Sequence, residues 1–505
     1  MTSLNERLLT LAPERLKGIR RGIEKESLRT SPSGQLAQTA HPRALGSALT
    51  NPHITTDFSE AQVELVTGAH ASVQDCLQEL TQIHQFVYQA LDHEQLWVSS
   101  MPGALPADEA IPIGQYGSSN VGQAKSVYRM GLGHRYGRRM QTISGIHYNW
   151  SMPGLSNDDY FGLIRNFRRQ SFLLLVLFGA SPAVTTCFVH GQNHGLQPLG
   201  DHTLYLPYAT SLRMGRLGYQ SDAQSSLAVS YNGLKGYAAS LQDALTRAYP
   251  AYEAIGIQDE QSGYKQLSTS LLQIENEFYS TIRPKRVIQT GERPLHALRE
   301  RGVEYVEVRC MDLNPFLSIG IDDNTVRFLD IFLLHCLLSD SPEDTPQEIA
   351  ALARNQQKVA TRGREPGLRL ERGNDEVLLM DWAKDIVQRC QTIAQALDAA
   401  QGGRAHQEAW QAAASALADP SLLPSARVVA AMQSQQTPGH VAFSLAQSAQ
   451  THAKLTAQAL SAEVLAKFEQ QAQTSLQDQT AIEAADTLPF EAFRQDYMSA
   501  RHLLV

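Results

Sequence analysis

The sequence has few cysteines, and no two of them are spaced as in a C-x-x-C pair. The five cysteines are widely separated along the chain: Cys76, Cys187, Cys310, Cys336 and Cys390. An odd number without close pairs argues against both a disulfide scaffold and a zinc knuckle. We therefore expect the thiols to be reduced and mostly buried.

Long apolar runs are also missing. The longest, from Phe172 to Phe178, falls far short of the ~18 residues that a membrane span needs. Residues 1–13 contain acidic side chains and no apolar core, so they do not have the pattern of a signal peptide. We expect a cytoplasmic protein with no membrane segment.

An excess of basic charge is lacking as well. The 43 lysines and arginines are outnumbered by 51 aspartates and glutamates, which gives a net charge of -8. A dedicated nucleic-acid binder needs clustered positive charge, so we expect no nucleic-acid partner. The 43% hydrophobic and 19% charged residues are typical of globular proteins, and 505 residues suffice for a large enzyme core with appendages.

Common nucleotide and nucleophile motifs are absent too. No GxxxxGK[ST] segment occurs, so any nucleotide must be bound without a Walker P-loop, and there is no GxSxG elbow. The glycines of residues 131–137 (GLGHRYG) resemble a dinucleotide fingerprint, but their spacing is wrong and no acidic residue follows at the expected distance.

The chain does contain two carboxylates one residue apart, in residues 17–29 (KGIRRGIEKESLR). Apolar and polar residues alternate here, which predicts a strand. Because side chains on a strand alternate faces, Glu24 and Glu26 then point the same way. Two like charges on one face favour a bound cation, although a solvated strand face is the alternative reading of this segment alone.

Other predicted strands, at residues 54–66, 142–152 and 302–309, carry similar groups: Asp57, Glu64, His147 and Glu307. Several strands that offer carboxylates to one sheet face would form an oxygen-rich bowl suited to Mg²⁺ or Mn²⁺, with a histidine completing the set. Asp57 and Glu64 have opposite parity, so both face inward only if a bulge or a turn occurs at residues 59–61. A core histidine is the alternative for His147.

Basic residues near these segments form a second group: Arg129, Arg213, Arg283, Lys285, Arg286 and Arg309. Arginine binds phosphate and carboxylate bidentately and stays charged at any working pH, so the group indicates anionic substrates. Surface ion pairs are the alternative for each of them. Arg309 fits that alternative least, because it alternates with Glu307 in an otherwise apolar strand.

Helices are expected at residues 3–16, 72–93, 158–178 and 227–249, and through most of the chain after Pro315. The segment 72–93 has apolar residues at a 3.6-residue period behind a Ser72 cap. From about residue 377 the chain is rich in alanine and glutamine, and it contains no internal repeat.

Several segments together resemble one family, the proteobacterial glutamate-cysteine ligases. They are RGIEKESLR (21–29), HPRALGSALTNPHITTDFSEAQVEL (41–65), QTISGIHYN (141–149), LPYATSLR (206–213), QIENEFY (273–279), IRPKR (282–286) and EYVEVR (304–309). The resemblance implies an ADP-forming ligase that joins the γ-carboxylate of L-glutamate to the α-amine of L-cysteine through γ-glutamyl phosphate. This is the first step of glutathione biosynthesis.

The resemblance also implies an α+β fold like that of glutamine synthetase, with an antiparallel sheet curved around the active site and a large helical C-terminal portion. We expect a catalytic domain at 1–375 and a helical region at 376–505 that packs on it. A monomer is the expected state.

Residue by residue, the resemblance assigns three groups of site residues. The metal ligands, for Mg²⁺ with Mn²⁺ as an alternative, are Glu24, Glu26, Asp57, Glu64, His147 and Glu307; the cysteine pocket is Phe58, Tyr128, Tyr219 and Tyr279; the basic residues around the substrates and the transferring phosphate are Arg129, Arg213 and Arg309. We further expect Asn149 to bind substrate and Lys285 and Arg286 to bind ATP.

Two other functions stay open at this point. A related carboxylate–amine ligase would keep the metal and nucleotide site but use another amine acceptor. A catalytically silent protein that binds ATP or an amino acid is the second possibility. The presence of Glu24, Glu26 and Glu307 speaks against it, because losing a purposeless cluster would relieve charge repulsion.

Overall fold

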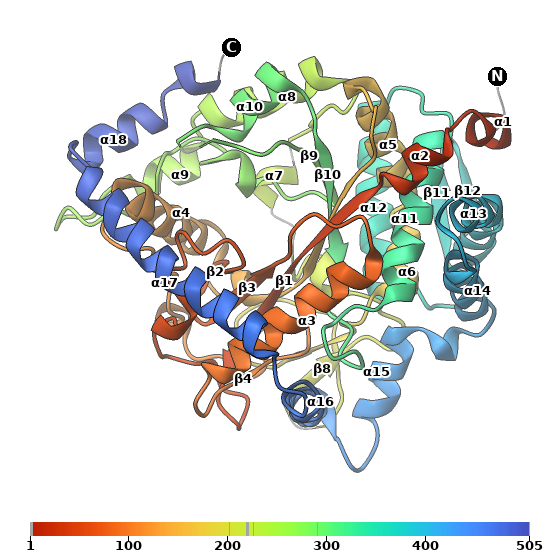
Figure 1. Ribbon diagram of the computed structural model, residues 1–505, viewed down its shortest axis with the longest axis horizontal. Helices are drawn as coiled ribbons and strands as arrows, with labels where there is room; N and C mark the ends of the chain where they lie inside the picture. The colour runs from red at the N-terminus through yellow and green to blue at the C-terminus, as the bar shows by residue number, and fades with distance from the viewer. Residues whose placement is uncertain (1–3, 201, 219–221, 226, 290, 504–505) are drawn as a thin grey trace.

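The computed structural model describes residues 4–200, 202–218, 222–225, 227–289 and 291–503 (Figure 1). Its strands are β1 Arg20–Thr30, β2 Ile54–Thr56, β3 Gln62–Val66, β4 Gln95–Leu96, β5 Ile146–Ser151, β6 Ala183–Thr185, β7 Gln197–Pro198, β8 Thr203–Tyr205, β9 Ile282–Lys285, β10 Tyr305–Met311, β11 Arg369–Arg372 and β12 Asp375–Leu378.

Helices make up most of the remaining regular structure. Up to residue 362 they are α1 Leu4–Leu9, α2 Pro13–Lys17, α3 Val73–Gln89, α4 Asn120–Tyr136, α5 Asn157–Gln170, α6 Phe172–Phe178, α7 Asp222–Ser225, α8 Leu234–Thr246, α9 Pro250–Ile255, α10 Pro294–Arg301, α11 Asp323–Leu338 and α12 Pro346–Arg362. They are followed by α13 Leu379–Gln401, α14 Ala405–Ala418, α15 Pro424–Met432, α16 Gly439–Thr456, α17 Ala462–Ala485 and α18 Phe490–Tyr497.

The main sheet is antiparallel and has the order β2-β3-β1-β5-β10-β9, with β4 paired to the far end of β1. The predicted strands at 17–29 and 302–309 are its members β1 and β10. Strands that pair in this sheet are not always consecutive in the chain, since β5 pairs with β1 on one side and with β10 on the other. The expected α+β class with an antiparallel sheet and a large helical C-terminal part is confirmed.

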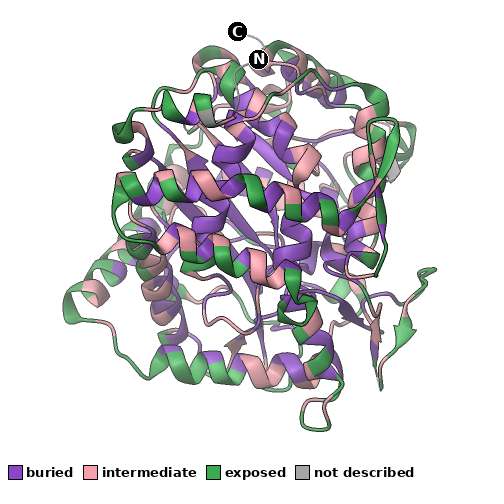
Figure 2. Cartoon of the chain, turned by 90° about the vertical axis from the view of Figure 1, so that its right-hand side faces the viewer, coloured by how far each residue is buried: buried purple, intermediate pink, exposed green. Residues whose placement is uncertain are grey.

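The two faces of the sheet have different surroundings. One face is covered by α3, α5 and α11, and Ile23, Val306 and the helices α11 and α13 share one apolar core. Below this face Arg21 forms a buried ion pair with Asp330 of α11, with a 3.1 Å separation between nitrogen and oxygen. In Figure 2 the strands are buried, whereas the helices in front of them are exposed or intermediate along their outer sides. The other face carries Glu24 and Glu26.

Helix boundaries depart from the sequence expectations where local signals interrupt the apolar period. The helix α3 begins as predicted, with the Ser72 hydroxyl accepting from the Asp75 N–H at 3.2 Å. The single helix expected at 3–16 is two, because Pro13 starts a new one. The one expected at 158–178 divides at Ser171 into α5 and α6, and α8 starts only after Gly233, whose φ is 134°.

The C-terminal helices pack around the preceding part of the chain rather than extending away from it. In Figure 1, α13 and α14 lie beside α11 on one side, and α17 and α18 lie beside α4 on the other. The Ser118 N–H, just before α4, donates to Glu483 of α17 at 2.8 Å. The division of the chain at residue 375 stays a prediction. In the described residues, no helix combines the length and the apolar character that crossing a membrane requires.

Candidate active site

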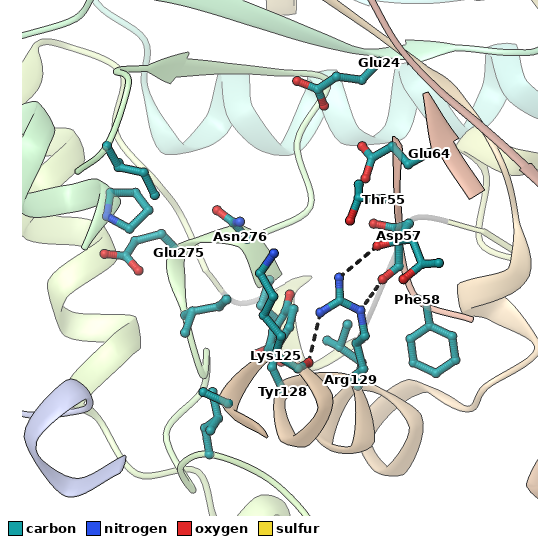
Figure 3. Close-up of a pocket in the computed structure, with 18 of the residues that line it drawn as sticks. Glu24, Thr55, Asp57, Phe58, Glu64, Lys125, Tyr128, Arg129, Glu275 and Asn276 are labelled. Carbon is teal, nitrogen blue, oxygen red and sulfur yellow. Dashed lines mark hydrogen bonds between the residues drawn. The ribbon is translucent and has the colours of Figure 1, made fainter. Parts of the chain in front are cut away.

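A cavity of about 400 Å³ lies between the bare face of the sheet and the helices α4, α10 and α18. Predicted site residues that line it are Glu24, Glu26, Asp57, Phe58, Glu64, Tyr128, Arg129, His147, Tyr279, Lys285, Glu307 and Arg309. In Figure 3, Glu24, Glu64 and Asp57 lie along one side of the cavity and Glu275 on the other, with Lys125 and Asn276 between them. The structure thus brings together residues from six elements (β1, β3, α4, β5, β9 and β10) and two connecting segments, the β2–β3 turn and the segment before β9.

Strand pairing sets the carboxylates side by side. Glu24 is opposite His147 on β5, and Glu26 is opposite Glu64 on β3. His147 Nδ1 lies 3.1 Å from a Glu24 oxygen and 3.8 Å from Glu307, and its Nε2 lies 3.9 Å from Glu26. One ligand atom from each residue falls within 4.8 Å of the others in two overlapping sets, Glu24–His147–Glu307 and Glu26–Glu64–His147. This spacing is compatible with a shared cation.

The parity conflict between Asp57 and Glu64 is resolved by a hairpin. The strand β2 ends at Thr56 and β3 begins at Gln62, so the two acidic residues are not on one continuous strand. The Asp57 N–H donates to the Gln62 carbonyl at 3.1 Å, which closes the turn between them. Both carboxylates line the cavity.

The electrostatics of this cluster oppose full ionisation without a cation. Burial, reinforced by the negative charge of Asp57, raises the pKa of Glu26 to about 8. Burial and the neighbouring carboxylates Glu24, Asp57 and Glu26 also raise the pKa of Glu64 well above its usual value. Burial would raise the pKa of Glu307 as well, but Lys285 and Arg309 outweigh it and hold that pKa well below the usual range.

A divalent cation fits this donor set. His147 Nε2 is buried and has no hydrogen-bond partner among the described residues, although a buried imidazole nitrogen normally has one. Carboxylate oxygens with one imidazole suit Mg²⁺ or Mn²⁺ better than zinc, which favours thiolates. The core-histidine alternative for His147 does not account for this orphaned nitrogen.

Positive side chains border the carboxylates. Arg309 Nη1 lies 3.1 Å from Glu307, and Lys285 Nζ lies 3.3 Å from it on the other side. Arg129 donates to the backbone carbonyls of Asp57, Thr56 and Lys125, as the dashed lines of Figure 3 indicate. These bonds fix its guanidinium at the turn of the β2–β3 hairpin.

Lys125 lines the cavity and was not predicted from the sequence. It lies one helical turn before Arg129 on α4, and its ammonium is 5.1 Å from the ring centroid of Tyr116. Burial lowers its pKa to about 8. The i, i+4 spacing from Arg129 is the signal that could have identified it, because residues so spaced share a helix face.

Arg213 is fully buried behind the cavity rather than in its wall. It donates to the Arg309 carbonyl at 2.9 Å and lies 3.7 Å from Asp312. Its guanidinium passes so close to Gly145 that any Cβ there would overlap it, while the Gly145 N–H donates to Glu26 at 2.7 Å. Arg213 therefore supports the strand that carries Arg309 and the turn that binds Glu26.

Three other predicted residues are not in the wall of this cavity. Asn149 donates from Nδ2 to Glu24 at 2.9 Å, so it orients a carboxylate. Arg286 points outward, where it donates to the Arg301 carbonyl at 2.7 Å and pairs with Glu304 at 3.6 Å. Tyr219 lies outside the described residues.

A second cavity of about 260 Å³ adjoins the first, and Tyr279 and Arg309 line both. The Tyr279 hydroxyl accepts from Gln141 Nε2 at 2.9 Å, and its ring meets that of Tyr136 edge-on with centroids 5.7 Å apart. Tyr279 thus lies at the boundary between the cavity that the carboxylates line and this second cavity.

Known proteins are similar to this chain in both sequence and fold. A family model described as glutamate-cysteine ligase matches residues 8–359. Glutamate–cysteine ligases from Saccharophagus degradans (47% identity, 95% of this chain and 94% of that protein) and Pseudomonas entomophila (48%, 98% and 97%) are similar throughout. The crystal structure of the Francisella tularensis enzyme in complex with AMP superposes with a TM-score of 0.90 at 36% identity, covering 95% of this chain and 97% of that one. This chain belongs to the glutamate-cysteine ligase family.

Proposed function

We propose that the cavity binds ATP, L-glutamate and L-cysteine and forms γ-glutamylcysteine, ADP and phosphate, the first step of glutathione biosynthesis. The observation that carries this is the convergence of Glu24, Glu26, Glu64, His147 and Glu307 on one cavity face, with Lys285 and Arg309 beside them. An enzyme that transfers a phosphoryl group needs both a cation site and fixed positive side chains. Membership of the family and the AMP bound to its Francisella relative support the same activity.

We assign the cation site to the carboxylate cluster. Glu24, Glu26, Glu64, His147 and Glu307 would hold Mg²⁺ or Mn²⁺, with Asp57 at the edge of the same face. A cation bound there would neutralise the charge on the ATP phosphate oxygens and on the transferring phosphoryl group. Asn149 orients Glu24 by its 2.9 Å hydrogen bond, and the Gly145 N–H orients Glu26 in the same manner.

The chemistry proceeds in two displacements. An amine cannot displace oxygen from an ionised carboxylate at neutral pH, so a γ-carboxylate oxygen of glutamate first attacks the γ-phosphorus of ATP and ADP leaves. The α-amine of cysteine then attacks the γ-carbonyl carbon of the acyl phosphate. The C–N bond forms, the C–O bond to phosphate breaks, and the amine loses its proton. The acyl phosphate must be kept from water, which the buried face of the cavity favours.

The positions of the basic residues suggest a different role in the reaction for each of them. Arg309 and Lys285 flank Glu307 and therefore lie where phosphoryl oxygens approach the cluster. A guanidinium is suited to oxygens that gain charge during transfer, because it presents parallel donors and stays protonated. We propose that Arg213 acts through Arg309, whose carbonyl it binds, and that Arg129 holds the hairpin turn that carries Asp57.

We propose that Tyr279 is part of the pocket that binds cysteine, so removing its side chain should weaken the binding of cysteine. Tyr279→Ala should raise KM for L-cysteine by roughly tenfold, since a pocket contact of this size is worth about 1–3 kcal/mol, and should leave KM for ATP nearly unchanged. Steady-state kinetics with each substrate varied in turn measures this. Tyr279→Phe keeps the ring and is the matched control. An effect confined to ATP would overturn the assignment.

The activity itself has a simple test. The protein is incubated with ATP, Mg²⁺, L-glutamate and L-cysteine, and ADP release is followed. We expect release to require both amino acids and the product mass to equal that of the γ-linked dipeptide. If ADP is released without cysteine, or is released faster with another amine in a panel of acceptors, this function is excluded.

Three broader features belong to the same proposal. We infer that the enzyme is cytoplasmic, that it acts as a monomer, and that residues 1–375 form the catalytic domain with 376–505 packed on it. The shared apolar core, which includes Ile23 of β1 and Trp382 of α13, supports the last of these. Light scattering of the purified protein tests the monomer directly.

A further inference from the structure

The cavity has two chemically different ends. The sheet end carries the carboxylates and their cationic neighbours, as described above. Away from the sheet, apolar and aromatic side chains at residues 267–274, 288–294 and 493–497 line the cavity, beside Glu275 and Glu292: Leu267, Ile274, Ile288, Pro294, Phe493 and Tyr497. ATP is also a molecule with two different ends, a triphosphate and a flat purine. Its phosphates belong at the sheet end, so the base must extend toward the apolar end.

Two of those apolar residues come from the last helix, α18. Phe490, Phe493 and Tyr497 occur at positions i, i+3 and i+7, which places them along one side of the helix. Phe493 and Tyr497 are half-buried and line the cavity, whereas Phe490 does not line it and packs on Tyr264 with ring centroids 4.8 Å apart. The Phe493 and Tyr497 rings are nearly parallel, at 7°, with centroids 5.8 Å apart.

A first anchor, Arg293, joins this helix to the cavity wall. Arg293 donates from Nη1 to the Tyr497 carbonyl at 3.0 Å, and its guanidinium carbon lies 5.0 Å from the centroid of the Tyr497 ring. The same side chain forms a buried pair with Glu275 at 2.8 Å, and Glu275 also accepts from the Leu295 N–H at 3.1 Å. Glu275 lines the cavity, so these contacts join α18, α10 and the wall segment at 275–277 to one another.

A second anchor joins α18 to the opposite wall. Arg494 donates to the Leu267 carbonyl at 2.6 Å, and α18 packs against α4, which carries Lys125 and Tyr128. In Figure 1, α18 lies above α4 and to the left of α10. The C-terminal helix therefore completes the apolar end of the cavity rather than covering a remote surface.

We propose that Phe493 and Tyr497 form the platform on which the purine of ATP stacks, and that Arg293 is a positioning residue that holds the platform in place. Stacking suits this end because a purine offers a flat face and an aromatic ring is the usual surface for it. The proposal rests on the proposed ATP-dependent function. It gives the C-terminal helix a direct part in nucleotide binding.

The test compares leucine replacements on the same helix. Phe493→Leu with Tyr497→Leu should raise KM for ATP about tenfold or more, as expected for loss of base stacking, with KM for glutamate and cysteine and kcat unchanged. Phe490→Leu, which removes an aromatic ring outside the cavity, is the matched control and should behave as wild type. Tyr497→Phe keeps the ring and should retain wild-type KM for ATP. A double variant with wild-type KM for ATP overturns the proposal.

A binding measurement separates stacking from a general effect on the helix. The triphosphate of 2-aminopurine riboside loses fluorescence when its base stacks, so wild type and Phe490→Leu should quench it and the double variant should not. Equal quenching by all three would overturn the proposal. This assay needs no turnover. If wild type quenches the probe but releases no ADP with both amino acids, the ligase function fails while the base site stands.

Discussion

Glu26→Gln is expected to lower kcat by about a thousandfold while leaving the fold intact. Glu26 faces the centre of the carboxylate cluster, 3.9 Å from the orphaned Nε2 of His147. An amide is a poor ligand for Mg²⁺, and losing the charge neutralisation that a metal supplies costs several kcal/mol in the transition state; each ~1.4 kcal/mol is a factor of ten in rate. Turnover with saturating ATP and Mg²⁺ measures the loss.

The fold should survive because the substitution resembles a state that Glu26 already adopts. Burial and Asp57 raise the pKa of Glu26 to about 8, so the cation-free protein holds this side chain largely neutral at pH 7. The amide oxygen can still accept from the Gly145 N–H. Glu304→Gln, at an exposed position just before β10, is the matched control and should keep full activity. Wild-type turnover in a correctly folded Glu26→Gln protein would remove Glu26 from the site.

The largest expected effect on stability is that of Arg21→Met. Arg21 and Asp330 are almost fully buried, and Asp330 also accepts a hydrogen bond from the Tyr148 hydroxyl at 2.7 Å. Removing the arginine leaves a buried carboxylate without its cation, which typically costs about 3–5 kcal/mol in the free energy of unfolding. Urea denaturation followed by circular dichroism measures the change.

Two controls isolate the cause of that loss. Arg20→Met changes the neighbouring arginine, which is exposed, and should leave the free energy of unfolding nearly unchanged. Arg21→Met combined with Asp330→Leu removes both charges and should recover much of the stability, because no buried charge is then left unpaired. If Arg21→Met unfolds at the same urea concentration as wild type, the pair does not join the sheet to α11 as described.

Local patterns in the sequence were sufficient to predict β1, β5 and β10 and the face of β1 that lines the site. Alternation in residues 20–30 predicts that Glu24 and Glu26 share a face, and the structure places both in the cavity wall. The Ser72 cap predicts the start of α3. The need for a bulge or a turn between Asp57 and Glu64 also follows from parity alone, and the structure has a turn there, in the β2–β3 hairpin. These features depend on neighbours within a few residues, so the hydrophobic period and the turn residues are enough to predict them.

Features that depend on distant contacts were not predictable in the same way. The sequence offers no reason to separate Arg213, buried beside Gly145, from Arg286, which faces Glu304. Nor does it indicate that Phe493 and Tyr497 reach the cavity, because their placement depends on Arg293 and α4, roughly two hundred or more residues earlier in the chain. An aromatic period on a C-terminal helix predicts only that one side is covered.

The central claim is that this chain activates the γ-carboxylate of glutamate as an acyl phosphate in the cavity beside Glu24, Glu26 and Glu307. The most direct measurement uses L-glutamate with ¹⁸O in both γ-carboxylate oxygens, together with ATP, Mg²⁺ and L-cysteine, and mass spectrometry of the released phosphate. The mechanism predicts that one ¹⁸O moves from glutamate to each inorganic phosphate formed. Phosphate without the label, or label recovered in AMP, would contradict it.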